Sequence, residues 1–360
     1  MLDEASAHGR LIHQFVDTLR ALPNIHVESP RWEVRRSNFP PDVQVDLHIS
    51  DKLVRLNIEI RTVLYPRDAR EILWRLQPSG EPFPQNSHSV VSVLVADSIS
   101  PGAKDFLREQ HIGYYDSGGS LYLPAPGAYI YIDKPPPKPL THSLGSLYSG
   151  VRAQVLYALL HRYQEWVGGQ ELAARAQVST ATASQVLMEL ERLELAESRG
   201  QGPHKERHVA QPGALLDSWV KHLTVKRAPV LRRYFVPSLK AESWEPLAQV
   251  FAVHRVEYAI SYEAAAQHYA PFISSVSQVR LRVLAGAATD AAIATMNARE
   301  VGEGANLAVI DAKPTGEFLF REQADGLWWA NPIQVYLDLQ RGEGRSKEMA
   351  EHLRRERIGF

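Results

Sequence analysis

The stretch from Gly168 to Leu193 reads GGQELAARAQVSTATASQVLMELERL. Its Gly-Gly pair interrupts the chain before a short segment with the composition of a helix. A tight turn follows, in which Ser179 or Thr180 is expected to be the N-cap of the next helix. That second helix is predicted from Ala181 onward, and four apolar residues fall on one face of it: Val186, Leu187, Leu190 and Leu193. The stretch therefore predicts two helices joined by a short turn.

The segments on either side extend this pattern. Val151 to Arg162 predicts a preceding helix, whose apolar residues are expected to form a buried face: Val151, Val155, Leu156, Leu159 and Leu160. Glu197 to Val209, after the stretch, is rich in glycine and charge and predicts a basic hairpin. Helices ordered in this way and followed by a hairpin are typical of a winged helix-turn-helix, which we place at residues 146–223.

In such a domain the first turn of the second helix points into the major groove of DNA. The side chains expected to face bases and phosphates are Ser179, Thr180, Thr182, Ser184 and Gln185. The hairpin cations expected along the DNA backbone or minor groove are Arg199, His204, Lys205 and Arg207. Winged helices also serve as packing or dimerisation modules. Small polar residues at the start of the second helix and a cationic hairpin together favour double-stranded DNA.

Length and composition limit the class of protein. The chain has 360 residues, 44% of them hydrophobic, which is enough for two or three domains with their own cores. Cysteine is absent from the sequence, which excludes disulfides, thiolate metal sites and cysteine nucleophiles. The apolar stretches are too short to span a bilayer, and the N-terminus lacks a signal-peptide pattern. We therefore expect a cytoplasmic protein that does not enter membranes.

The charge is distributed unevenly along the chain. The whole sequence has 40 Lys plus Arg and 41 Asp plus Glu, a net charge of −1, which argues against nucleic acid at first sight. Between Ser146 and Lys240, however, 13 basic residues stand against 8 acidic ones. The basic third of the chain is thus the part that contains the predicted helix-turn-helix.

Prolines mark a domain boundary upstream. Residues 133–145 begin with DKPPPKP, a composition that removes backbone donors and favours an extended linker. Residues 1–132 alternate helical and strand-like segments, which predicts an α/β domain with a mixed sheet. The expected helices are Ala5 to Leu22, Arg67 to Gln77 and Pro101 to Gln110, and the main strands are Val43 to Ile49, Leu53 to Ile60 and Ser89 to Ala96.

The last part of the chain, residues 224–360, predicts a second α/β domain. Its expected strands are Arg280 to Leu284, Asn306 to Ile310 and Gly326 to Ala330, followed by a helical region from Ile333. The fold class expected for the whole chain is therefore α/β and multi-domain, with a winged helix-turn-helix in the centre.

Two carboxylates and an arginine in the first domain resemble the motif of PD-(D/E)XK nucleases. Asp46 and Glu59 lie on successive predicted strands, Arg61 follows two residues after Glu59, and Pro41-Asp42 stands just upstream. The resemblance implies a restriction-endonuclease-like fold in which two carboxylates hold Mg²⁺ and a lysine positions the attacking water. Arginine stands at the lysine position, so we expect a nuclease-like domain without activity. The alternative is that Asp46 lies on a solvent-facing strand edge and Glu59 pairs with Arg61 or Arg55.

The C-terminal segment Gly326 to Arg354 resembles the closing motif of AbiE-type antitoxins of type IV toxin–antitoxin systems. Two further segments support this resemblance, residues 258–269 and GYYDSGGS at residues 113–120. It implies a transcriptional regulator that represses its own promoter, with a C-terminal domain that counters a nucleotidyltransferase-like toxin.

The residues of this C-terminal segment favour structure over catalysis. Asn331 is expected to cap a helix that has Pro332 in its first turn. Gln334 and Asp338 fall on one face of that helix, and Asp338 has no second carboxylate at a spacing useful for catalysis. The histidines show no metal-ligand spacing either, so we expect no cofactor and no metal.

The leading hypothesis is a sequence-specific regulator, a repressor that reads a palindromic operator as a homodimer. The first alternative is a Mg²⁺-dependent DNA endonuclease that uses Asp46 and Glu59. The second is an antitoxin that acts by contact with a nucleotidyltransferase-like toxin.

Overall fold

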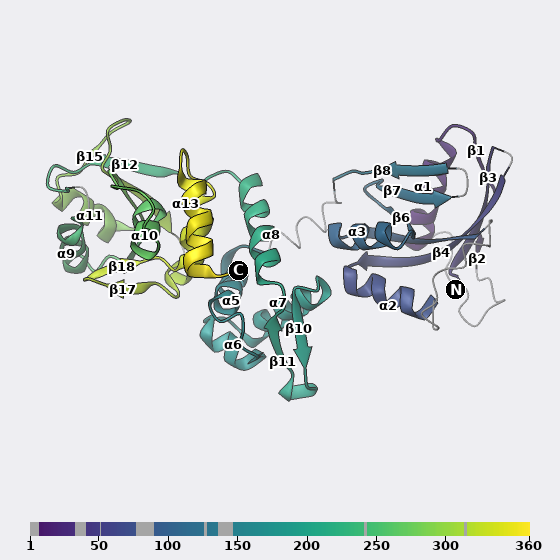
Figure 1. Cartoon of the computed structure of the whole chain (residues 1–360), viewed down its shortest axis with the longest axis horizontal. Coiled ribbons are helices and arrows are strands. Elements are labelled where there is room, and N and C mark those ends of the chain that lie inside the picture. The colour runs from purple at the N-terminus through teal and green to yellow at the C-terminus, as the bar shows by residue number, and fades with distance from the viewer. Residues whose placement is uncertain are drawn as a thin grey trace. The chain divides into compact units, whose positions relative to one another are not determined.

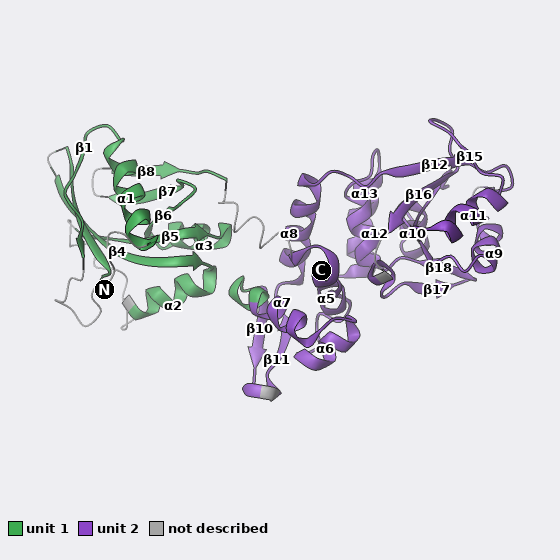
Figure 2. Ribbon diagram, turned by 180° about the vertical axis from the view of Figure 1, so that it is seen from behind, with its two compact units in different colours: residues 1–145, 189–194 green, residues 146–188, 195–360 purple. Residues whose placement is uncertain are grey.

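A computed structural model describes residues 7–32, 41–50, 52–76, 90–125, 128–135, 147–240, 243–312 and 315–360. The chain divides into two compact units (Figure 2). Unit 1 comprises Met1–Gly145 and Glu189–Glu194, and unit 2 comprises Ser146–Met188 and Leu195–Phe360. The two segments that we assigned to separate domains, 146–223 and 224–360, thus lie together in unit 2, except for Glu189–Glu194, which group with unit 1. Ala5, Gln77, Ser89 and residues 136–145 of the predicted linker lie outside the described residues.

Unit 1 is built on a mixed sheet, as the alternation of elements predicts. Its strands are β1 (Ile25–Val27), β2 (Arg31–Trp32), β3 (Val43–Ile49), β4 (Lys52–Leu64), β5 (Val90–Ile99), β6 (Gly113–Asp116), β7 (Leu121–Ala125) and β8 (Ala128–Ile132). They are ordered β1-β3-β4-β5-β6-β7-β8, and β2 pairs with β3. Strands β4, β5 and β6 are parallel, whereas β3 pairs with β4 and β7 with β6 in antiparallel fashion.

Helices cover both faces of this sheet: α1 (Ala7–Arg20), α2 (Pro66–Leu76) and α3 (Pro101–Glu109) (Figure 1). The alternating apolar residues of β3 and β4 form one buried cluster with those of α1, which includes Leu47, Ile58 and Phe15. Helices α2 and α3 pack on the other face, where Leu73 and Leu107 join Leu94 of β5. Because side chains alternate along a strand, the polar residues of β3 and β4 project on the face opposite α1.

The central part of the chain, residues 147–225, has the elements that its sequence predicts. They are α5 (Gly150–His161), β9 (Val167–Gly168), α6 (Gly169–Arg175), α7 (Thr180–Arg192), β10 (Ala196–Arg199), the 3₁₀ turn η1 (Gly202–His204), β11 (Glu206–Val209) and α8 (Pro212–Val225). Strands β10 and β11 form the predicted hairpin, and β9 pairs with β11 to make a three-stranded antiparallel sheet.

Two residues expected to be buried on these helices are not. Val186, Leu187 and Leu190 of α7 are fully buried, but Leu193 follows the end of the helix and is only half-buried. Val151 is 54% exposed in the first turn of α5, where burial begins only at Ala153. The residues of α5 from Ala153 to Leu160 are all buried. The spacing of apolar residues along α5 therefore does not single out one buried face.

The second part of unit 2 is a seven-stranded mixed sheet with helices around it. Its strands are β12 (Leu231–Phe235), β13 (Tyr258–Ser261), β14 (Val279–Leu284), β15 (Arg299–Glu300), β16 (Leu307–Ala312), β17 (Glu322–Ala324) and β18 (Leu327–Trp329), in the order β15-β12-β16-β14-β13-β18-β17. The helical elements are α9 (Glu245–Val253), α10 (Tyr262–Tyr269), α11 (Ala287–Thr295), η2 (Thr315–Phe318), α12 (Pro332–Leu339), α13 (Ser346–Leu353) and a π-helical turn η3 (Arg354–Ile358).

The architecture confirms an α/β multi-domain fold. The three strands predicted in the last part of the chain correspond to β14, β16 and β18. Asn331 caps α12 as predicted, because its side chain accepts a hydrogen bond from Gln334 N at 2.9 Å. In the portion of the chain that the structure describes, the helices are too short or too polar to cross a membrane.

Candidate nucleic-acid interface

The turn between α6 and α7 is fixed by local hydrogen bonds. Gln177 has a positive φ of 52°, and Val178 N donates to Ala173 O at 3.0 Å, which ends α6. Ser179 Oγ accepts from Thr182 N at 3.1 Å and lies 2.9 Å from Thr182 Oγ1. Ser179 is therefore the N-cap of α7, and Thr180 is its first helical residue. The cap orders the start of α7 and engages two of the five hydroxyl and amide side chains expected to face DNA.

The exposed face of α7 contains some of the predicted contact residues. Thr180 and Gln185 are exposed, and so is Ser179 beside its capping bonds. Thr182 and Ser184 are half-buried. Ser184 Oγ lies near Gly169 at the start of α6, where a Cβ would come within 3.7 Å of it. Thr180 and Gln185 are thus the predicted contact residues within α7 that are exposed.

The hairpin β10–β11 has a tip that depends on glycine. Gly200 and Gly202 have φ values of +75° and +57°, and a Cβ on Gly200 would lie 2.6 Å from His204 O. The exposed Arg199 is held by Glu206, with Nε and Nη2 at 2.7 and 2.6 Å from the same carboxylate oxygen. Its guanidinium also lies 4.5 Å from the Trp166 ring centroid. The hairpin cation nearest to the tip on β10 is therefore already paired.

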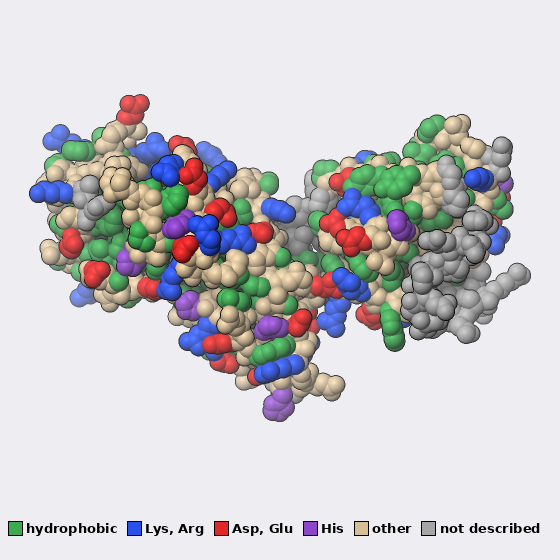
Figure 3. Space-filling model, viewed as in Figure 1, with side chains coloured by type: hydrophobic (Ala, Val, Ile, Leu, Met, Phe, Trp, Pro, Cys, Tyr) green, Lys and Arg blue, Asp and Glu red, His purple; other side chains and the backbone are tan. Residues whose placement is uncertain are grey.

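The other predicted hairpin residues differ in exposure. His204 is exposed at the end of η1, whereas Lys205 and Arg207 are half-buried. On the face shown in Figure 3, basic and acidic side chains are interspersed over this part of the molecule. The surface around α7 and the hairpin consequently has mixed charge, although its segment of the sequence is basic overall.

The nuclease-like residues of unit 1 are arranged differently from the prediction. Asp46 is paired in register with Arg55, four residues along β4 from Glu59. Asp42 is the carboxylate near Glu59, because its Oδ2 accepts from Ile60 N at 2.8 Å. Arg61 lies 3.7 Å from Asp42 and 3.3 Å from Glu59. The structure therefore brings together Asp42, Glu59 and Arg61, and does not bring Asp46 to them.

The two carboxylates predicted as metal ligands have opposite electrostatic environments. Hydrogen bonds from Arg55 lower the pKa of Asp46, burial opposes them, and Arg31 adds to the lowering. Burial raises the pKa of Glu59, and the nearby Asp42 carboxylate raises it further. Asp46 is thus a neutralised ion-pair partner, whereas Glu59 is a carboxylate held under electrostatic strain. In the sequence, the Pro41-Asp42 dipeptide of the nuclease-like motif already indicated that Asp42 is the carboxylate beside Glu59.

Among the described residues, these carboxylates are not part of a cluster of metal-ligating side chains. Within the described ranges, no group of three or more His, Asp or Glu side chains could hold a metal ion. Asp42 and Glu59 supply two carboxylates, and Arg61 places a fixed positive charge beside both. A divalent cation at this place would have to compete with that guanidinium.

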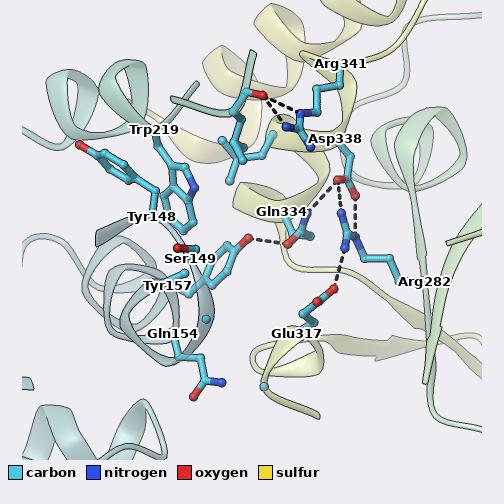
Figure 4. Close-up of a pocket in the computed structure, with 15 residues that line it drawn as sticks. Tyr148, Ser149, Gln154, Tyr157, Trp219, Arg282, Glu317, Gln334, Asp338 and Arg341 are labelled. Atoms are coloured by element: carbon cyan, nitrogen blue, oxygen red, sulfur yellow. Dashed lines mark hydrogen bonds and ion pairs between the residues drawn. The ribbon is translucent and has the colours of Figure 1, made fainter. Parts of the chain in front are cut away.

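Gln334 and Asp338 of α12 belong to a buried polar cluster in unit 2 (Figure 4). Arg282 of β14 donates to Asp338 of α12 through Nε at 3.0 Å and Nη2 at 2.5 Å, and to Glu317 of η2 at 2.7 Å. Asp338 also accepts from Gln334 at 2.9 Å and from Ser261 at 2.6 Å. The oxygens of Asp338 are therefore occupied by partners of the protein itself, which agrees with the structural role expected for it.

Comparison of the chain with family models, with curated proteins and with solved structures yields no match.

Proposed function

We propose that the protein is a sequence-specific regulator of transcription, a repressor that binds double-stranded DNA. The elements α5, β9, α6, α7 and the hairpin β10–β11 follow in the order of a winged helix-turn-helix. The observation that carries the proposal is the start of α7, where Ser179 caps the helix and leaves Thr180 and Gln185 exposed. A capped helix with small polar residues at its N-terminus suits entry into the major groove.

The proposed roles follow from side-chain chemistry. Gln185 has an amide that can bond an adenine edge through both its donor and its acceptor. Thr180 and Ser179 are suited to phosphates, which also favour the positive end of the helix dipole. In the hairpin, His204 and Lys205 would lie along the DNA backbone. Arg199 would have to exchange Glu206 for a phosphate, which reduces its net contribution.

The experiment starts from a pool of duplexes with a randomised centre, from which the full-length protein selects its preferred sequence. We expect Gln185→Ala to weaken binding of the selected duplex by about 1–3 kcal/mol, because one bidentate base contact is lost. Binding of unrelated duplexes should change little. Fluorescence anisotropy at physiological salt measures both affinities, and raising the salt should weaken each of them.

The matched control is Gln249→Ala, which removes an exposed glutamine from helix α9. This variant should bind the selected duplex like the wild type. If selection enriches no sequence, or if Gln185→Ala leaves the preference intact, α7 is not the reading helix.

The proposal includes a homodimer on a palindromic site, since a two-fold protein matches a two-fold operator. It also includes, from the resemblance to AbiE-type antitoxins, a nucleotidyltransferase-like toxin as a partner of unit 2. Light scattering with and without the selected duplex tests the dimer. Co-purification with the product of the adjacent gene tests the partner.

A second candidate function is a Mg²⁺-dependent endonuclease, favoured by the approach of Asp42 to Glu59. Its ligands would be Asp42 and Glu59 rather than Asp46 and Glu59. Incubation of plasmid DNA with the protein and Mg²⁺ separates the two functions. Cleavage that is lost in Asp42→Ala and kept in Asp46→Ala would favour the nuclease, whereas intact plasmid in all three favours the regulator.

A further inference from the structure

A cavity of about 210 Å³ lies within unit 2, lined by residues of α5, α8 and α12. Helices α5 and α8 flank the helix-turn-helix along the chain, whereas α12 belongs to the last part of unit 2. In Figure 4 aromatic side chains occupy one side of this cavity, and arginine and carboxylate side chains occupy the other. The cavity therefore has two chemically distinct walls.

The aromatic wall consists of Tyr148, Tyr157 and Trp219. The ring centroids of Tyr157 and Trp219 are 4.8 Å apart, and those of Tyr148 and Trp219 are 6.0 Å apart. Trp219 is only 2% exposed, so its ring is held firmly by its neighbours. Such a wall favours a flat ring, since aromatic rings attract each other in offset or tilted contacts.

The polar wall contains one cation that lacks a carboxylate partner. Arg282 is neutralised by Asp338 and Glu317. Arg341 instead donates to the backbone carbonyls of Leu223 and Lys226, and among the described residues no carboxylate lies within 4.0 Å of its guanidinium. Burial lowers the pKa of Arg341, and the Asp338 carboxylate opposes this lowering from beyond ion-pair distance. An anionic ligand at Arg341 would add a counter-charge at hydrogen-bonding distance.

We propose that this cavity binds a small aromatic carboxylate, with the ring against Trp219 and Tyr157 and the carboxylate at Arg341, and that binding changes the affinity of α7 for DNA. The size is suitable, because a cavity of roughly 150 Å³ holds benzene. About 210 Å³ thus accommodates one ring with one small substituent. The regulatory half of this proposal rests on the proposed function, whereas the binding half does not.

The contacts around the cavity explain how ligand binding would affect the DNA-binding elements. Tyr157 of α5 donates a hydrogen bond to Gln334 of α12, so the two walls are tied directly. Gln154 of α5 packs so closely on η2 that a Cβ on Gly316 would lie 1.6 Å from its amide nitrogen. A ligand between these walls shifts the equilibrium between arrangements of α5 and α12 by its difference in affinity for them.

The first test is isothermal titration of the full-length protein with benzoate. We expect saturable binding of one benzoate per chain in the millimolar range or tighter. Benzamide, which has the same shape without the charge, should bind about tenfold more weakly because the charge-assisted bonds to Arg341 are lost. Absence of saturable benzoate binding, or equal affinity for benzamide, would overturn the proposal.

Two variants, Ala153→Leu and Arg341→Gln, test whether benzoate binds in this cavity. Ala153→Leu adds volume to a residue of the lining and should abolish benzoate binding, whereas Val151→Leu on the exposed side of the same helix should not. Arg341→Gln should remove the preference for benzoate over benzamide. Circular dichroism checks that each variant is folded. Wild-type binding by a folded Ala153→Leu variant would locate benzoate elsewhere and overturn the assignment.

The second test measures the affinity for the selected duplex with and without saturating benzoate. We expect a change of about fivefold or more in the wild type and none in Ala153→Leu. Benzoate binding with unchanged DNA affinity would overturn the regulatory half alone. A protein that binds benzoate but selects no DNA would instead contradict the proposed function and leave the ligand site standing.

Discussion

Arginine–carboxylate clusters occur in both units, but water reaches them to different extents. On the strand face of unit 1, Asp46 is buried while the side chains of its partners Arg31 and Arg55 are 50% and 40% exposed. In unit 2 the side chains of Arg282 and Asp338 are 12% and 4% exposed. Removal of Asp46 in unit 1 leaves arginine charges that water can solvate, whereas removal of Arg282 in unit 2 leaves a carboxylate that water cannot solvate. The same pairing chemistry therefore predicts different costs.

The largest effect is expected in the buried cluster. Arg282→Met should destabilise unit 2 by about 3–5 kcal/mol, because Asp338 would be left charged and without its strongest donor. Urea denaturation followed by tryptophan fluorescence measures this cost. Most tryptophans of the chain lie in unit 2, at positions 166, 219, 244, 328 and 329.

The matched control for this variant is Arg345→Met. Arg345 pairs with Glu348 at 3.1 Å, and both side chains are more than 60% exposed. Its loss should cost less than about 1 kcal/mol. Equal costs for the two variants would show that burial does not distinguish the clusters.

An intermediate effect is expected for Asp46→Asn in unit 1. The variant should lose about 1–2 kcal/mol at neutral pH, since charge-assisted bonds to two arginines are weakened and both arginines remain solvated. Hydrogen bonds from Arg55 and Arg31 lower the pKa of Asp46 in the fold, against the opposition of burial. The stabilisation is therefore fully present above the pKa of the unfolded carboxyl group and is lost as pH falls through the lowered folded value.

Hydrogen–deuterium exchange of peptides from β3 and β4 measures this local stability. The wild type should lose protection on acidification more steeply than Asp46→Asn. A variant with the same acid dependence as the wild type would show that the Arg31 and Arg55 bonds contribute nothing to stability.

These sites also show what the sequence could and could not predict. The period of the apolar residues predicted the bounds of β3 and most of α7, because one buried face dictates each pattern. It could not choose between Asp42, directly before β3, and Asp46 within it, since the two are four residues apart and fit the same alternation of faces. Only the register across β3 and β4 decides that Asp42 is the neighbour of Glu59.

The cavity of unit 2 was beyond prediction for another reason. Tyr157, Arg282 and Asp338 are far apart in the sequence and meet only through tertiary packing. Local patterns correctly placed Gln334 and Asp338 on one face of a helix, and the hydrogen bond between them follows from that spacing. The identity of their partners on β14 and α5 depends on which elements pack together, and no local pattern contains that information.

The smallest effect, with the opposite sign, is expected for Glu59→Gln. Burial and the Asp42 carboxylate raise the pKa of Glu59, so its charged form is destabilised in the folded state. Neutral glutamine should therefore stabilise β4 by up to about 1 kcal/mol at neutral pH. The gain should shrink as pH falls through the raised folded pKa toward the unfolded one, because the wild-type carboxyl becomes protonated too. Exchange in β4 peptides across this pH range measures it, and a loss of protection at neutral pH would mean that the ion pair with Arg61 outweighs burial and repulsion from Asp42.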